Sequence, residues 1–215
     1  GTGSWLYFNS PTPRASNSGS GNTTSLEAPE FSHSAGLYSS SINVTLSTNV
    51  QNATIIYTLD GSEPDINNVN GSTYKYKNDF PHDVGSSFGP LLDQSYKSFT
   101  YNSPISINDR SNDEDVLAKK TTIPDEPYLP PVSVRKSTVL RAKVYLNGKG
   151  SRTRTRNYFV WPEGNPYSVP LVALTTFEGN LFGYNDGIYT PGAVFDQWRT
   201  ENPNGNQPSR SGGAT

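Results

Sequence analysis

Alternating apolar and polar residues predict short β-strands through the middle of the chain. Residues 42–47 place Ile42, Val44 and Leu46 on one face, and this period of two residues indicates a half-buried strand. Residues 53–59 are rich in β-branched and aromatic side chains, which favour strands. Three further strands are predicted at 101–107, 137–146 and 151–160.

Turn residues separate these strands and place the loops. Asp60-Gly61 directly follows the second strand, and Asn147-Gly148 is typical of a tight hairpin between the last two. Residues 65–100 contain few aliphatic side chains and predict a long loop or an irregular insertion.

The C-terminal part shows a different pattern. Residues 169–176 form an apolar run, which predicts a strand more buried than those before it, and residues 187–189 predict a short strand. No helix of ordinary length is predicted anywhere. The pattern therefore indicates an all-β protein with long loops and a short β-rich C-terminal extension.

Composition agrees with a folded β protein and excludes several classes. Of the 215 residues, 32% are hydrophobic and 17% are charged, whereas the turn-forming residues Ser, Asn, Gly and Pro are abundant. An aromatic content of 12% is too high for a disordered tail. A net charge of -2 argues against a nucleic-acid partner. No apolar run is long enough to predict a membrane span.

Cysteine and methionine are both absent. The lack of Cys excludes disulfides, thiolate nucleophiles and cysteine-bound metals, and the two histidines, His33 and His82, are isolated in sequence. With the abundance of Ser, Thr and Asn, this composition predicts an exported bacterial protein, either extracellular or at the cell surface.

Several segments resemble one known type of domain. Residues 54–64, TIIYTLDGSEP, resemble the signature of the chitobiase/β-hexosaminidase C-terminal domain, and residues 101–107 and 137–160 resemble its later strands. The resemblance implies an antiparallel, immunoglobulin-like β-sandwich over residues 30–162. Such modules serve as accessory domains in glycoside hydrolases and surface proteins.

Other segments resemble the spore-coat kinase (CotH) family. Residues 107–117 are similar to its long-loop sandwich variant, and residues 169–198 to the opening of its kinase-like region. Residues 6–17 are similar to the end of a lamin-tail-like domain, with Arg14 where that pattern has Gly. Since the family's kinase motifs lie downstream of the GIYTPG segment, we expect no catalysis from residues 1–215.

These resemblances divide the chain into three parts. Residues 1–29 are interpreted as the end of an upstream lamin-tail-like domain and a linker, and residues 30–162 as the sandwich. Residues 163–215 are interpreted as the start of a CotH-like region, with a flexible tail at 200–215.

Asp60, Gly61 and Ser62 form the most compact motif. A structural turn is the favoured interpretation, in which Asp60 caps the turn through an Asx-type hydrogen bond and Gly61 adopts a positive φ. A ligand-binding role for Asp60 is the alternative.

An acidic cluster could hold calcium. Asp109, Asn112, Asp113 and Asp115 supply oxygen ligands at close spacing, as a calcium site requires. Their spacing is not that of an EF-hand. A loop of solvated acidic residues is therefore favoured, with a calcium ion as the alternative, and no other cofactor is expected.

Two further sets of side chains are candidates for binding a ligand. Arg152, Arg154 and Arg156 alternate along one predicted strand and could bind an anionic polymer, although a solvated face paired with acidic residues is favoured. Four aromatic residues are candidates for stacking on sugars, with packing at domain junctions as the competing role: Trp161, Tyr167, Tyr189 and Trp198.

The sequence thus predicts a non-catalytic accessory or spacer module of an exported CotH-like protein. Its expected partners are the adjacent domains of the parent chain. The alternative is a carbohydrate-binding module that recognises a polysaccharide. An enzyme would require paired carboxylates or metal-binding acids that no motif here supplies.

Overall fold

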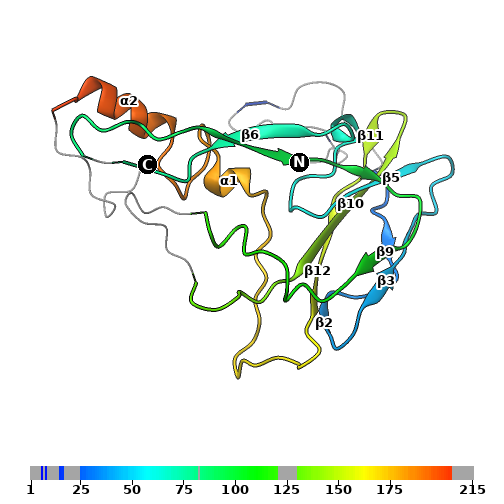
Figure 1. Ribbon diagram of the computed structural model, residues 1–215. Helices are drawn as coiled ribbons and strands as arrows, with labels where there is room; N and C mark the ends of the chain where they lie inside the picture. The colour runs from blue at the N-terminus through cyan, green and yellow to red at the C-terminus, as the bar shows by residue number, and fades with distance from the viewer. Residues whose placement is uncertain are drawn as a thin grey trace.

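The computed structural model describes residues 6, 8, 15, 16, 25–81, 83–120 and 130–204. In this part of the chain most regular elements are strands, and the two α-helices come last (Figure 1). In chain order the elements are β1 (Glu30–Phe31), β2 (Gly36–Tyr38), β3 (Ile42–Val44), β4 (Leu46–Ser47), β5 (Thr54–Thr58), the 3-10 helix η1 (Ile66–Asn68), β6 (Ser72–Tyr76), β7 (Leu92–Tyr96), β8 (Phe99–Thr100), β9 (Ile105–Ile107), β10 (Thr138–Leu146), β11 (Lys149–Gly150), β12 (Arg154–Val160), α1 (Gly179–Phe182) and α2 (Ala193–Glu201).

The largest sheet has the strand order β2-β12-β10-β5-β8, with β11 paired to β10. Its neighbouring strands are antiparallel, except that β2 runs parallel to β12. The antiparallel pairs β3–β9 and β1–β4 supply the opposing layer. This arrangement confirms the predicted all-β, immunoglobulin-like sandwich, which is antiparallel apart from that one pair.

The hydrophobic core lies between the main sheet and the opposing pairs. Alternate residues of β10 point into it, because successive side chains of a strand face opposite sides. The buried core residues are Val44, Leu46, Ile55, Ile105, Ile107, Leu140, Ala142, Val144, Tyr158 and Val160. The residues between them on β10 face outward, where they form the groove described below.

Among the described residues Tyr158 is the largest fully buried side chain, and its hydroxyl donates to the His33 carbonyl at 3.1 Å. Burial, with a smaller effect of Tyr38, raises the pKa of Tyr158 to about 12. A phenol whose pKa is higher in the folded state stabilises the fold below pH 10, and this stabilisation disappears as the pH rises to about 12. In urea titrations between pH 10 and about 12, the free energy of unfolding of wild type should therefore fall by roughly 1–3 kcal/mol more than that of Tyr158→Phe. Equal losses in the two proteins would contradict the assignment.

The strand boundaries differ from the prediction at 42–47 and 101–107, and also at 151–160, where β12 begins only at Arg154. The strand expected at 42–47 divides at Thr45, because β3 pairs with β9 whereas β4 pairs with β1. The strand expected at 101–107 begins only at Ile105, directly after Pro104, whose missing N–H cannot enter a ladder.

The hairpin after β10 contains an irregularity that matters for the surface. Asn147 and Gly148 both have positive φ, 49° and 75°, as a tight hairpin turn requires. Tyr145 pairs with Gly150, but Ala142 pairs with Arg154, so that three residues on one strand oppose two on the other. This β-bulge at 151–153 bends the strand and separates Arg152 from the alternation that joins Arg154 and Arg156.

Residues 65–100 are more ordered than predicted. They contain the antiparallel β6–β7 ribbon, in which Ser72 lies opposite Tyr96 and Tyr76 opposite Leu92. The expected long loop is therefore wrong for residues 72–76 and 92–96. The ribbon was missed because its inward side chains are mainly Tyr and Gln rather than aliphatic residues.

The C-terminal extension is helical rather than β-rich. Neither 169–176 nor 187–189 forms a strand, and α1 and α2 follow in their place. Among the described strands none pairs with 169–176, whose apolar side chains stay exposed: Leu174 is 93% exposed. An apolar run becomes a strand only where another strand offers it a hydrogen-bonding edge.

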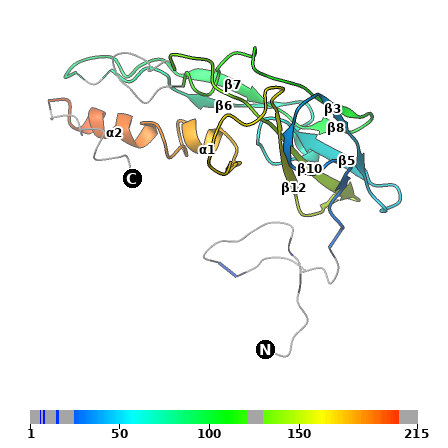
Figure 2. The ribbon, with the colours of Figure 1, turned by 90° about the horizontal axis from the view of Figure 1, so that it is seen from below.

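The two helices lie along the β6–β7 ribbon, beside the sandwich (Figure 2). No helix in the described part of the chain has the length and apolar character of a membrane span. The upstream residues 1–29 fall largely outside the described residues. The tail predicted at 200–215 begins inside α2, which ends at Glu201, and its residues beyond 204 lie outside the described residues.

Candidate functional site

The turn at 60–62 folds back over the outer face of the main sheet. Gly61 has a φ of 79°, and the Ser62 N–H donates to Asp60 Oδ1 at 2.9 Å, which is the geometry of an Asx turn. Thr58 Oγ1 donates to the Ser62 carbonyl at 2.7 Å, and Arg141 Nη1 donates to the Gly61 carbonyl at 2.8 Å. The Asp60 carboxylate and the carbonyl groups of Gly61 and Ser62 are thus engaged in hydrogen bonds that hold the turn.

Gly61 also lies against the segment that leads to α1. A Cβ atom at Gly61 would lie 2.4 Å from the carbonyl oxygen of Thr176. Only glycine permits this approach together with a positive φ. The turn therefore determines where residues 175–177 cross the sandwich.

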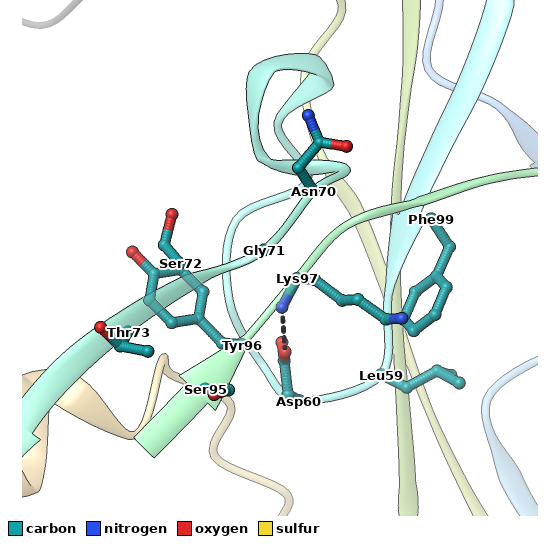
Figure 3. A pocket seen from close by; sticks show the side chains of 10 residues that line it. All are labelled: Leu59, Asp60, Asn70, Gly71, Ser72, Thr73, Ser95, Tyr96, Lys97 and Phe99. Atoms are coloured by element: carbon teal, nitrogen blue, oxygen red, sulfur yellow. Dashed lines mark hydrogen bonds between the residues drawn. The ribbon is translucent and has the colours of Figure 1, made fainter. Parts of the chain in front are cut away.

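A first groove lies between this turn and the β6–β7 ribbon (Figure 3). It has a volume of about 730 Å³ and is lined by Leu59, Asp60, Asn70, Gly71, Ser72, Thr73, Ser95, Tyr96, Lys97 and Phe99. One face of the Phe99 ring stacks on Tyr57 with centroids 5.3 Å apart, and Lys97 Nζ lies 4.8 Å from its centroid. The groove therefore offers polar groups but an aromatic ring that is already covered.

A second, larger groove lies between the outer face of β10–β11, the 62–68 loop and the 175–180 segment, and we call it the basic groove. Its volume is about 1110 Å³. Four basic and two acidic side chains line it: Arg141, Lys143, Lys149, Arg152, Glu63 and Asp65. Although the whole chain carries a net charge of -2, the described residues that line this groove include two more basic than acidic side chains.

Glu63 organises one wall of the basic groove. Its carboxylate accepts from Arg141 Nη2 at 2.6 Å and from Lys143 Nζ at 2.9 Å, and the Thr153 hydroxyl also donates to it. Burial alone would raise the pKa of Glu63, but the hydrogen bonds and the positive charges outweigh it and lower that pKa. Glu63 is therefore ionised at neutral pH and holds two cations at fixed positions.

The structure does not bring the four proposed calcium ligands together. Asp109 accepts from the Ser111 N–H at 2.9 Å, Asp113 pairs with Arg110 at 2.7 Å, and Asp115 pairs with Lys136 at 2.7 Å. Asn112 is exposed. No group of three or more His, Cys, Asp or Glu residues in the described ranges could hold a metal ion. Each carboxylate has its own local partner in a surface loop.

The aromatic residues proposed for sugar stacking lie apart from the grooves. Trp161 is only 4% exposed and its Nε1 donates to the Lys136 carbonyl at 3.0 Å, so its ring is part of the packing. Tyr167 packs against Trp161, and Tyr189 against Phe182, in T-shaped ring pairs, while both tyrosines remain largely exposed. Trp198 is half-buried on α2. The four rings form no common platform.

A buried ion pair joins α2 to the ribbon. Lys77, directly after β6, pairs with Asp196 of α2, and their side chains are 2% and 12% exposed. Tyr184 donates to the same carboxylate at 2.9 Å, and Lys77 also donates to the Phe88 carbonyl. Arg199 of α2 donates to the Ser86 and Ser87 carbonyls, both at 3.1 Å.

A second buried lysine joins α1 to the ribbon. Lys120 Nζ lies 2.8 Å from the Tyr74 hydroxyl and 3.4 Å from Glu178, next to α1. It also lies 4.3 Å from the ring centroid of Tyr76 and 5.4 Å from that of Phe182. Burial lowers the pKa of Lys120, although the charge of Glu178 opposes this effect. We call the Lys77 and Lys120 contacts together the lysine clamp.

Neither the lysine clamp nor the basic groove follows from a local sequence motif. The partners in the clamp are 119 residues apart for Lys77–Asp196 and 104 for Tyr74–Glu178. The sequence feature that could have indicated the groove is the alternation in β10, which places Arg141 and Lys143 on its outward face. That alternation indicates a cationic face, but the turn that covers part of it lies far away in sequence.

Comparison with known proteins identifies one domain type. The family model of the chitobiase/beta-hexosaminidase C-terminal domain matches residues 33–88. These residues run from before β2 through β6, and they include the 60–62 turn. No curated protein and no solved structure matches the chain. The match supports a domain of this type in the first part of the sandwich.

Proposed function

We propose that the chain is a non-catalytic accessory module of an exported bacterial protein, and that it holds the segment after the sandwich in a fixed orientation. The lysine clamp is the observation that carries this proposal. It attaches both C-terminal helices to a ribbon inserted into the sandwich, through two lysines that are almost completely buried. Buried charges tolerate little displacement, because separation leaves each one without a partner.

Two further observations support the proposal. The match of residues 33–88 to the chitobiase/beta-hexosaminidase C-terminal domain, a carbohydrate-associated type of module, is consistent with an accessory role. The resemblance of residues 169–198 to the opening of the CotH kinase-like region would make the oriented segment the start of that region. On this proposal the partners of the module are the neighbouring domains of its own parent chain.

Distance measurements between two spin labels test the proposal directly. Because the sequence has no cysteine, Asn43→Cys in β3 and Val194→Cys in α2 create the two labelling sites, and both positions are exposed. We expect a single narrow distance distribution by pulsed electron resonance. In the same pair with Asp196→Ala added, the distribution should broaden. A broad distribution in the wild-type background would show that the module is not a rigid spacer.

Carbohydrate binding is the second candidate function, and the basic groove is the observation that favours it. The groove combines charged groups with the half-buried rings of Tyr96, Tyr145 and Phe177. Binding sites for sugars use such rings with hydrogen-bonding groups around them. Spacer and binding roles are compatible, since the groove and the clamp use different residues.

A further inference from the structure

We propose that the basic groove binds an anionic glycan whose sugars carry single carboxylates, and that Arg152 is its principal charged contact. The inference rests on carbohydrate binding, the second candidate above, and names the ligand class. It follows from the state of Arg152, from the charge distribution along the groove and from the chemistry of its walls.

Arg152 is a cation in the groove without a partner. Within the described residues its side chain makes neither an ion pair nor a hydrogen bond, and the residue is exposed. By contrast, Arg154, the first residue of β12, pairs with Glu30 at 2.6 Å. The bulge at 151–153 places Arg152 along the groove instead of on the same face as Arg154 and Arg156. Bulges often redirect a side chain next to a functional site.

The remaining charges of the groove favour a ligand of low charge density. Glu63 neutralises one of the two cations that it holds, Arg141 and Lys143. Asp65 accepts from the Asn67 N–H at 2.9 Å and caps η1. These two carboxylates would repel a densely charged polyphosphate, but they can accept hydrogen bonds from sugar hydroxyls.

The uncharged walls fit sugar rings better than an extended polyanion. Tyr145 is held by a hydrogen bond from its hydroxyl to the Pro64 carbonyl at 2.9 Å, and it lies beside Lys143. Asn180 donates to Thr176 Oγ1 at 2.9 Å on the opposite wall. An aromatic face close to a fixed cation suits a ring with an apolar face and a carboxylate substituent.

Isothermal titration calorimetry of the full 215-residue chain tests the inference with three probes: polygalacturonate, cellohexaose and inorganic polyphosphate. We expect polygalacturonate to bind, more weakly as salt is added, because salt screens exposed charges. Arg152→Gln should weaken that binding about tenfold, since a charge-assisted hydrogen bond is lost. Lys119→Gln, at an exposed lysine outside the groove, should change it by less than about twofold.

The other results separate the possible errors. Equal binding of cellohexaose would overturn the anionic class and leave carbohydrate binding intact. Equal or tighter binding of polyphosphate would show simple charge attraction and overturn the glycan. Wild-type affinity in Arg152→Gln would overturn the role of that residue. No binding of any probe would overturn both this inference and the carbohydrate-binding candidate.

Discussion

Asp196→Ala is expected to destabilise the attachment of α2 by about 3–5 kcal/mol, because it leaves the Lys77 ammonium buried without its carboxylate. Lys77 is 3% exposed and cannot reach water without moving the helix or the ribbon. The loss should be visible as faster hydrogen exchange over 184–204 and as a lower midpoint in urea. Because the lesion is local, the sandwich core should remain protected.

An exposed ion pair in the ribbon offers a matched control. Lys75 pairs with Asp93 across the ribbon at 2.7 Å, but both side chains are more than half exposed. Asp93→Ala should therefore reduce stability by less than about 1 kcal/mol. The double variant Lys77→Met with Asp196→Leu should recover most of the loss, since replacing both charges removes the unpaired one. If Asp196→Ala and Asp93→Ala have equal effects, the buried pair does not fasten α2.

Gly61→Ala is expected to reduce the free energy of unfolding by at least about 2 kcal/mol. A residue with a Cβ adopts the left-handed conformation at an expense of about 1 kcal/mol, and here the added atom would also lie 2.4 Å from the Thr176 carbonyl oxygen. Since this contact involves backbone atoms of both the 60–62 turn and the segment at Thr176, relieving it should shift residues 175–177 away from the turn. Hydrogen exchange over those residues would report the shift.

Gly85 is the appropriate control for this substitution. Its φ is also 79°, and a Cβ atom at this position would have no other atom within 4 Å among the described residues. Gly85→Ala should therefore show only the conformational effect of about 1 kcal/mol. The difference between the two variants measures the contact with Thr176. Equal losses in denaturant titrations would mean that the turn does not position this segment.

The sandwich could be predicted because its strands carry local signals. The alternation in β10, the β-branched content of β5 and the Asn147-Gly148 turn each predict one element without reference to the rest of the chain. These signals placed the centre of the main sheet, although they missed the bulge. A bulge changes the count of residues by one and leaves the composition unchanged.

The ribbon and the C-terminal helices could not be predicted in the same way. Tyr74 and Tyr76 are half-buried, and Lys120 contacts both of them while Phe177 packs against Tyr74, so their inward orientation depends on residues that follow much later. The apolar run at 169–176 shows the opposite error, since its composition suits a buried strand but no described strand lies beside it. Period and composition indicate which side chains of a segment favour burial, but the segment becomes a strand only where another segment pairs with it.

The candidate sites also differ in whether they depend on neighbouring residues or on distant segments. Asp60 and its turn are local, and their geometry is what the three residues alone suggest. The acidic residues near 109–115 are close in sequence, but their side chains turn to different basic or backbone partners. Closeness along the chain was thus a poor guide to convergence in space, whereas the basic groove gathers residues from distant segments.

The long separations in the lysine clamp also set an order of events during synthesis. Tyr74 leaves the ribosome 104 residues before Glu178, to which it donates, and Lys77 leaves it 119 residues before Asp196, with which it pairs. Contacts of such separation form late, because a long loop must first be closed. Until then the nascent chain exposes the tyrosine-rich face of the ribbon, at the stage when wrong pairing is most damaging. The charged residues Lys75 and Asp93, on the outer side of the ribbon, are well placed to discourage such pairing.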